Sequence, residues 1–264
     1  MKVRYLLIVV VALLVAGILT ASSYAKIDPK TCVGAWLFDE DKGNVAKDSS
    51  GGKNDGTLKN NPKWAQGKFG GALEFNGANA HVDCGDADNL SITKTITVQA
   101  WVNFGGSPSS AIIVSKYGVS GSGLSYMLVI NGDAGAAGRA SFFLASWRHY
   151  ATQINDKNWH HLAATVSSEA IRLYVDGEVD SALGGTGSIS ASNSTVTIGA
   201  PNSNAWGSSY SGLIDEVAIF NVALEEEDIL TLMKKGTGPA LGLAAVDSSG
   251  KLTTTWSGIK NPVK

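Results

Sequence analysis

The segment from Asp48 to Thr57 is the part of the chain richest in short side chains that carry oxygen. It reads Asp-Ser-Ser-Gly-Gly-Lys-Asn-Asp-Gly-Thr. Aspartate and asparagine oxygens are the hard ligands that calcium prefers, and glycine lets backbone carbonyls turn toward an ion. The spacing does not match an EF-hand loop, so a calcium site here would have to combine this segment with distant ones. The alternative is a turn cluster held by hydrogen bonds between side chains and backbone.

Two aromatic patches are candidates for contact with a sugar ligand. Aromatic rings present large apolar faces, and small-molecule sites combine such faces with a few polar groups that fix orientation. Turn residues flank both patches, so we expect exposed rings; the alternative is that these rings belong to the core. The first patch contains Trp147, Arg148 and Tyr150, and the second contains Trp206 and Tyr210.

The sequence lacks the common catalytic motifs. A glycosidase needs two carboxylates that flank the scissile bond, and no Glu-x-Asp-x-Glu run places such a pair on one face of a strand. No Gly-x-Ser-x-Gly, His-Glu-x-x-His or Gly-x-x-x-x-Gly-Lys motif occurs either. The adjacent His160 and His161 would point to opposite faces of a strand, so they cannot make a close metal site alone. These absences favour a non-catalytic binding module over an enzyme.

The first 25 residues have the layout of a secretory signal peptide. Lys2 and Arg4 form a short basic region, the apolar run 6–19 follows, and small residues lead to Ala25. We expect cleavage after Ala25 and a secreted, periplasmic or cell-surface protein. The alternative is an uncleaved anchor, but the apolar run is shorter than the ~20 residues that a membrane-spanning helix needs. We therefore expect no membrane span after cleavage.

Export makes Cys32 and Cys84 candidates for a disulfide, because exported proteins mature in an oxidising compartment. The bridge would close a loop of about 50 residues and stabilise the fold by ~3–4 kcal/mol. The alternative is a pair of buried free thiols, which behave as small hydrophobic side chains.

Composition places the chain among weakly charged globular proteins. Glycine accounts for 31 of the 264 residues, charged residues make up 17%, and the formal net charge is −2. Nucleic-acid binders usually carry a basic surface, so the sequence predicts no nucleic-acid partner. The glycines lie largely between short segments rich in β-forming residues, as turns of a multi-stranded protein require.

Those segments predict an all-β fold. Residues 96, 98, 100 and 102 alternate with more polar ones, as in a half-buried strand, and Asp176-Gly177 indicates a two-residue hairpin turn. One helix is predicted over 223–235, with acidic residues at its start, lysines at its end and Gly236 as a stop. We expect a two-sheet antiparallel jelly-roll sandwich with one short helix on the C-terminal side. Residues 236–264 are expected to form a tail or linker.

Five segments, in order and spacing, carry a family resemblance. The chain between residues 31 and 235 resembles the laminin G-like jelly-roll domain of the concanavalin A-like lectin/glucanase superfamily, in its pentraxin-like bacterial form. The segments are Gly-Ala-Trp-Leu-Phe-Asp-Glu at 34–40, the loop 48–57, Gly-Gly-Ala-Leu-Glu-Phe-Asn-Gly at 70–77 with His-Val-Asp at 81–83, Trp-His-His-Leu-Ala-Ala-Thr at 159–165 with Leu-Tyr-Val-Asp-Gly at 173–177, and Gly-Leu-Ile-Asp-Glu-Val-Ala-Ile-Phe at 212–220 with its continuation to 229.

This resemblance implies a sandwich whose first strand lies near its last. It also implies a calcium ion near the junction of the Asp-Ser-Ser-Gly loop with the Ile-Asp-Glu segment. On that analogy Asp39, Asp48, Asn54 and Asp215 are the candidate ligands. Lys53 departs from the Gly-Asn-Gly-Asn pattern of relatives and would have to point away from a cation.

The favoured function is a secreted, non-catalytic module for carbohydrate binding or adhesion, with a glycan or another cell-surface ligand as its partner. Two alternatives stay open: a structural or protein-interaction domain of an envelope or surface assembly, and a glycan-cleaving enzyme on the same fold. The sequence indicates neither the ligand nor an oligomeric state.

Overall fold

The structure is a computed structural model that describes residues 27–106, 111–117, 124–130, 138–144, 146–184, 189–201 and 209–243. The predicted signal peptide, Trp206 and the predicted tail beyond residue 243 lie outside these residues. Among the described residues, no helix is long and apolar enough to cross a membrane.

The described strands form two antiparallel sheets of eight strands each, so the predicted two-sheet sandwich is confirmed. The first sheet has the strand order β14-β13-β12-β7-β16-β5-β4, and β1 also pairs with β16. Its strands are β1 (Cys32–Trp36), β4 (Lys63–Gln66), β5 (Gly71–Asn76), β7 (Ile96–Phe104), β12 (Trp159–Val166), β13 (Ala170–Val175), β14 (Glu178–Gly184) and β16 (Ser211–Phe220).

The second sheet has the order β11-β10-β9-β8-β15-β6-β3-β2. Its strands are β2 (Val45–Ala46), β3 (Gly56–Lys59), β6 (His81–Asp83), β8 (Ala111–Tyr117), β9 (Leu124–Ile130), β10 (Arg139–Leu144), β11 (Ser146–Gln153) and β15 (Val196–Ile198). Two short 3-10 helices, η1 (Pro29–Thr31) and η2 (Asp88–Leu90), precede β1 and β7. The main hydrophobic core lies between the two sheets.

The alternation predicted for β7 is confirmed, but its second face is not solvent-exposed. Ile96, Val98 and the following even-numbered residues belong to the core between the sheets. On the opposite face Thr97, Gln99 and Trp101 are at most 4% exposed. A strand whose polar residues are buried needs partners for them, and helices and loops that pack on this face supply most of those partners.

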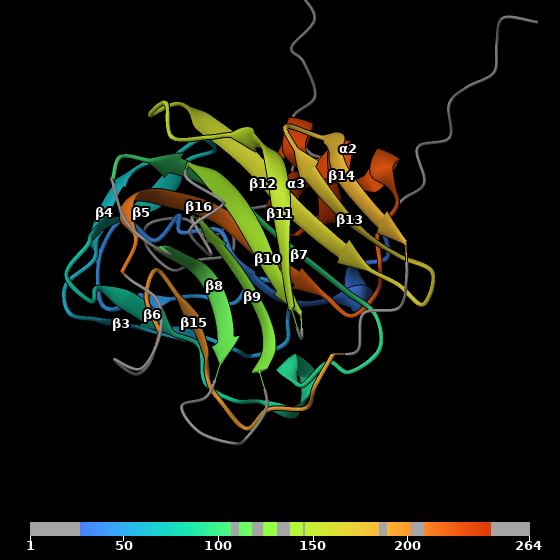
Figure 1. Ribbon diagram of the computed structural model, residues 1–264. Helices are drawn as coiled ribbons and strands as arrows, with labels where there is room; N and C mark the ends of the chain where they lie inside the picture. The colour runs from blue at the N-terminus through green and yellow to red at the C-terminus, as the bar shows by residue number, and fades with distance from the viewer. Residues whose placement is uncertain are drawn as a thin grey trace, which may run out of the picture.

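Two helices cover part of this outer face of the first sheet, beside β13 and β14 (Figure 1). They are α2 (Glu226–Lys235) and α3 (Thr237–Leu241). Helix α2 begins three residues later than predicted, because Glu225 is its extended N-cap and the Leu224 amide donates instead to the Thr97 hydroxyl at 2.9 Å. The predicted stop at Gly236, with φ of 77°, is confirmed.

The helices pack through their apolar side chains. Ile229 and Leu232 of α2 and Leu241 of α3 join Tyr174 and Phe220 of the sheet in a second hydrophobic cluster. The first described residues of the predicted tail therefore form a helix that buries Leu241 against the sandwich. Asp176 and Gly177 join β13 to β14 with φ values of 51° and 83°, so the predicted two-residue turn is also confirmed.

The predicted disulfide is wrong for this structure. Cys32 and Cys84 are both buried free thiols. Cys32 belongs to the cluster under the helices, whereas Cys84 belongs to the core between the sheets, so the two side chains lie on opposite faces of the first sheet. Burial raises the pKa of the Cys32 thiol to about 12 and raises that of Cys84 well above its ordinary value. Both groups are therefore protonated and unreactive at neutral pH.

A thiol titration tests this arrangement. Without reductant, native protein should react with a thiol reagent at neither cysteine, and protein unfolded in guanidinium should react at both. The physical reason is that the thiolate is the reactive form and burial disfavours it. Unfolded, unreduced protein that shows no reactive thiol would contradict the structure and restore the disulfide.

Candidate functional site

Two of the four predicted calcium ligands, Asp39 and Asp215, are held by the turn between β4 and β5. Asp215 Oδ2 accepts hydrogen bonds from the backbone amides of Lys68 and Phe69, both at 2.9 Å. Asp39 Oδ1 accepts one from the Gly71 amide at 2.8 Å. One short turn therefore holds carboxylates that lie 176 positions apart in the sequence, at the start and the end of the sandwich.

The charges of this acidic cluster are poorly compensated. Asp215 is fully buried, and its Oδ1 has no hydrogen-bond partner. Burial, with repulsion from Glu216 and Asp39, raises the pKa of Asp215 to about 9. Burial raises the pKa of Glu216 to about 7 and also raises that of Asp39. Phe38 and Glu216 have φ values of 57° and 55°, so the backbone is strained beside both aspartates. An unpaired carboxylate oxygen among acidic neighbours is a chemical fit to a hard cation.

The other two predicted ligands, Asp48 and Asn54, serve the turn itself. Asp48 Oδ1 accepts hydrogen bonds from the Ala35 amide and from the amide and hydroxyl of Ser50, and its Oδ2 accepts one from the Asn54 amide. Both carboxylate oxygens are thus occupied by protein donors, as the turn-cluster alternative requires. Among the described residues, no group of three or more His, Cys, Asp or Glu side chains is placed to hold a metal ion.

Tyr150 and Tyr210 are core residues, so their predicted role as sugar-stacking rings is wrong. Tyr150 is 1% exposed and its hydroxyl donates to the Ala163 carbonyl at 2.7 Å. Tyr210 is fully buried and packs against Phe75 and Phe104, with ring centroids 6.2 and 5.4 Å apart. Each phenol sits inside the sandwich with a polar partner for its hydroxyl. Trp206, the other member of the second patch, lies outside the described residues.

Trp147 and Arg148, by contrast, are half-buried on β11, an edge strand of the second sheet. The Trp147 ring contacts Phe143 edge-on at 4.9 Å between centroids and lies nearly parallel to the His149 ring, at 6.5 Å. The Arg148 guanidinium donates to the Trp147 carbonyl at 3.0 Å and to the Ser146 hydroxyl. These contacts hold a partly exposed indole in one orientation.

Trp147 ends a row of residues that are directly paired across seven strands of the second sheet. Paired residues of antiparallel strands point to the same side of a sheet, and their strand neighbours fill the core, so this row lies on the outer face. In order from β3 to β11 the row is Thr57, Asp83, Thr197, Ser115, Met127, Phe143 and Trp147. We call it the cross-strand row.

The cross-strand row is polar at one end, aromatic at the other, and buried in its centre. Thr197 and Ser115 are 1% exposed and Met127 is 2% exposed, whereas Thr57, Asp83 and Trp147 are half-buried. The row was missed from the sequence, because strand pairing alone brings these separate positions together. Only the alternation in His81-Val82-Asp83 hinted that Asp83 points outward.

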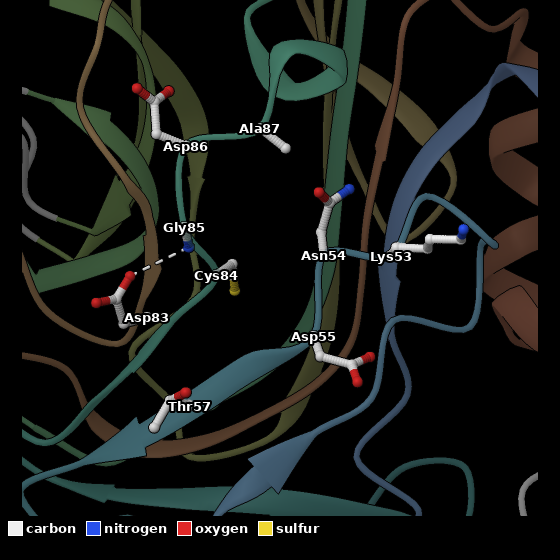
Figure 2. Close-up of a pocket in the computed structure, with 9 residues that line it drawn as sticks. All are labelled: Lys53, Asn54, Asp55, Thr57, Asp83, Cys84, Gly85, Asp86 and Ala87. Carbon is white, nitrogen blue, oxygen red and sulfur yellow. Dashed lines mark hydrogen bonds between the residues drawn. The ribbon is translucent and has the colours of Figure 1, made fainter.

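A pocket of about 370 Å³ adjoins the polar end of the row. It lies between the segments 53–57 and 83–87, as Figure 2 shows. Thr57 and Asp83 belong both to the row and to the pocket. The full lining is Lys53, Asn54, Asp55, Thr57, Asp83, Cys84, Gly85, Asp86 and Ala87. The outer face of the second sheet therefore offers two accessible regions, one aromatic and one rich in oxygen atoms.

The two adjacent histidines have structural partners. His161 is fully buried, its Nε2 lies 2.8 Å from Gln99 Oε1, and burial lowers its pKa to about 3. His160 lies between Asp176 and Asp156, whose carboxylates accept from its ring nitrogens at 2.9 and 3.1 Å, and the Asp176 hydrogen bond raises the pKa of His160. The prediction that they point to opposite faces is confirmed.

A family model described as the concanavalin A-like lectin/glucanase superfamily matches residues 76–230. This match covers more than half of the chain. The chain belongs to that superfamily. Comparison with curated proteins gave no match.

Solved structures of the superfamily fold resemble the chain at low sequence identity. One is domain 4 of AbnA, an extracellular GH43 arabinanase from Geobacillus stearothermophilus, in complex with arabinotriose. It has a TM-score of 0.63 and 21% identity, and the match covers 77% of this chain and 98% of the domain. Trypanosoma rangeli sialidase in complex with sialic acid has a TM-score of 0.59 and 18% identity, and the match covers 77% of this chain and 32% of the sialidase chain. Botulinum neurotoxin type C, whose cell entry depends on interaction with two ganglioside molecules, has a TM-score of 0.59 and 16% identity. That match covers 81% of this chain and 53% of the neurotoxin chain.

These likenesses concern the fold. The chain spans about a third of the sialidase chain and about half of the neurotoxin chain. The similar structures include parts of enzymes as well as a binding domain, so the superfamily fold alone does not decide between binding and catalysis.

The acidic cluster predicts a pH dependence in the presence of a chelator. The pKa of Asp215 is about 9 in the folded chain and near its ordinary value when unfolded, so the folded state binds more protons between these values. Stability should therefore fall as the pH rises from about 5 to about 9. In Asp215→Asn this decline should be shallower, as measured by urea unfolding at each pH. The exposed control Asp88→Asn should keep the wild-type slope, and equal slopes in all three proteins would contradict the burial of Asp215.

Proposed function

We propose that the protein is a secreted, non-catalytic module that binds a carbohydrate through the aromatic end of the cross-strand row. The observation that carries this proposal is the half-buried Trp147, held by Phe143 and His149 at an accessible edge of the second sheet. A sugar ring has an apolar face that an indole can cover, and a fixed indole loses little conformational entropy on binding.

Polar groups beside Trp147 suit the rest of a sugar. Arg148 makes two hydrogen bonds with its own strand through one guanidinium nitrogen. A guanidinium has five N–H donors, so others can reach sugar hydroxyls. Ligand sites commonly combine an aromatic wall with a few such oriented polar groups.

Relatives in the superfamily support a glycan as the ligand class. The similar arabinanase domain was solved with arabinotriose, and cell entry of the similar neurotoxin depends on interaction with two ganglioside molecules. Both similarities are below 25% identity, so they support the class of ligand and transfer no residue roles.

The placement of the carboxylates supports a non-catalytic role. A glycosidase acid needs a raised pKa and access to the scissile oxygen. Asp215 and Glu216 have raised pKa values, but they are at most 3% exposed and lie in the first sheet, away from the pocket and from Trp147. Three carboxylates line the pocket, but Asp55 and Asp86 are each paired with a lysine, which leaves Asp83 alone where a glycosidase needs two.

Replacement of Trp147 tests the proposal. In Trp147→Ala, affinity for glycans identified on an array should fall at least tenfold, because burial of a large apolar side chain contributes about 1.5–3 kcal/mol. Titration calorimetry would measure the loss, and circular dichroism would verify folding.

The matched control is Trp64→Ala. Trp64 is also half-buried on an edge strand, but in the first sheet, where its indole donates to the Gly43 carbonyl at 3.0 Å. This variant should keep wild-type glycan affinity. Equal losses in both variants, or binding to a protein with no glycan signal, would overturn the proposal and favour a protein-interaction domain. Sugar release that one carboxylate substitution abolishes would instead favour an enzyme.

We also propose a calcium ion at Asp39 and Asp215. The support is the unpartnered Asp215 Oδ1, the pKa of Asp215, which burial and then the nearby Glu216 and Asp39 raise, and the pKa of Asp39, which burial raises. Backbone carbonyls and water would complete the coordination, as they often do around calcium. The ion would neutralise buried negative charge and stabilise the turn between β4 and β5.

Thermal melting tests the calcium site. Calcium at a hundredfold excess over its Kd should stabilise the folded chain by about 2.7 kcal/mol, which is a shift of several degrees. The chelator EDTA should reverse the shift, and Asp215→Asn should abolish it, while Asp48→Asn should keep it. No shift in the wild-type protein would remove this site.

A further inference from the structure

The pocket of Figure 2 contains a buried hydrogen-bond acceptor that lacks a partner. Asn54 is 3% exposed, and its Oδ1 makes no hydrogen bond. Its amide nitrogen donates to the Val33 carbonyl at 2.7 Å, and this bond fixes which amide atom is the oxygen. The oxygen is then on the side toward Gly85 (Figure 2).

Asn54 is also held rigidly through its backbone. Its amide donates to Asp48 Oδ2 and its carbonyl accepts from Trp36 Nε1, both at 2.9 Å. Three anchors, two on β1 and one at Asp48, leave the side-chain oxygen little freedom to find another partner. Because a buried acceptor without a partner destabilises the folded chain, a ligand donor at this position would be favoured.

The carboxylates around the pocket leave one negative charge uncompensated. Asp55 is paired with Lys47 at 2.6 Å, and Asp86 is paired with the fully buried Lys116. Asp83 Oδ1 accepts a hydrogen bond from the Gly85 amide at 3.1 Å, but Asp83 makes no ion pair with any described residue. Lys53 lines the rim, and its side chain extends away from the 83–87 segment (Figure 2).

The distribution of these acceptors indicates an organic ligand. A metal ion needs oxygen atoms that converge on one point, and no three described acidic, histidine or cysteine side chains do so. The acceptors here lie around about 370 Å³, near the small end of the ~300–1,000 Å³ range of ligand pockets. A ligand with several separated donors and one positive charge fits this arrangement.

We propose that this pocket binds an amino sugar through its free ammonium group and hydroxyls, with Asp83 and Asn54 Oδ1 as the principal acceptors. The pocket would be a second subsite, at the polar end of the row whose aromatic end carries Trp147. It rests on the proposed function in that the ligand is a sugar, and it adds a preference for a cationic one.

Nuclear magnetic resonance of 15N-labelled protein tests this subsite with glucosamine, glucose, N-acetylglucosamine and methylammonium. Glucosamine should shift the Gly85 amide and the Asn54 side-chain amide, and should bind about tenfold more tightly than each of the others. Glucose and N-acetylglucosamine lack the positive charge, and methylammonium lacks the hydroxyls. Equal affinity for glucosamine and any of these probes, or no shift at Gly85 and Asn54, would overturn the proposal.

Asp83→Asn is the decisive variant, because it removes the uncompensated charge with little change of shape. It should abolish the tenfold preference for glucosamine over glucose, whereas Asp88→Asn, an equal charge change at an exposed residue outside the pocket, should keep it. A preference that survives in Asp83→Asn would contradict the assignment. The Trp147 indole signal and Trp147→Ala report separately on the aromatic end, so failure there is distinguishable from failure here.

Discussion

The pairing of β16 with β1, β5 and β7 holds the sandwich together. The first half of β16 pairs with β5 and the second half with β1, so the last strand joins the start of the described chain on one edge and β7 on the other. The pairing with β7 shifts register between Asp215 and Ala218. A bulge of this kind re-aims side chains, and it places Asp215 against the Lys68–Phe69 amides and Glu216 against the start of α3.

The two sheets differ in what covers their outer faces. The first sheet carries α2 and α3, and its buried polar residues Gln99 and His161 bond to each other and, through Gln99, to Glu216 and Thr237. The outer face of the first sheet is therefore partly buried under the two helices. The second sheet keeps the two ends of the cross-strand row accessible, one with Trp147 and one beside the Asn54 pocket. Both of the proposed ligand sites therefore lie on the second sheet.

Local patterns in the sequence predicted the elements well. The alternation in β7, the Asp176-Gly177 turn and the Gly236 stop of α2 all depend on neighbours within a few residues, and all three are present. The sequence could not show that the polar face of β7 is buried, because the helices that cover it come more than a hundred residues later. It also could not show that Tyr150 points inward, since alternation gives two faces without saying which one is the core.

The candidate sites likewise depend partly on local sequence and partly on long-range packing. By itself the sequence determined the all-β class, the superfamily resemblance and the oxygen-rich loop at 48–57, because these rest on residue types and local spacing. Only the tertiary structure decided that Asp48 serves its own turn, whereas one other turn holds both Asp39 and Asp215. It also decided that Cys32 and Cys84 lie in different hydrophobic clusters and that Asp83 shares a row with Trp147. The physical reason is that strand pairing and register are set by long-range packing, which places residues from distant segments side by side.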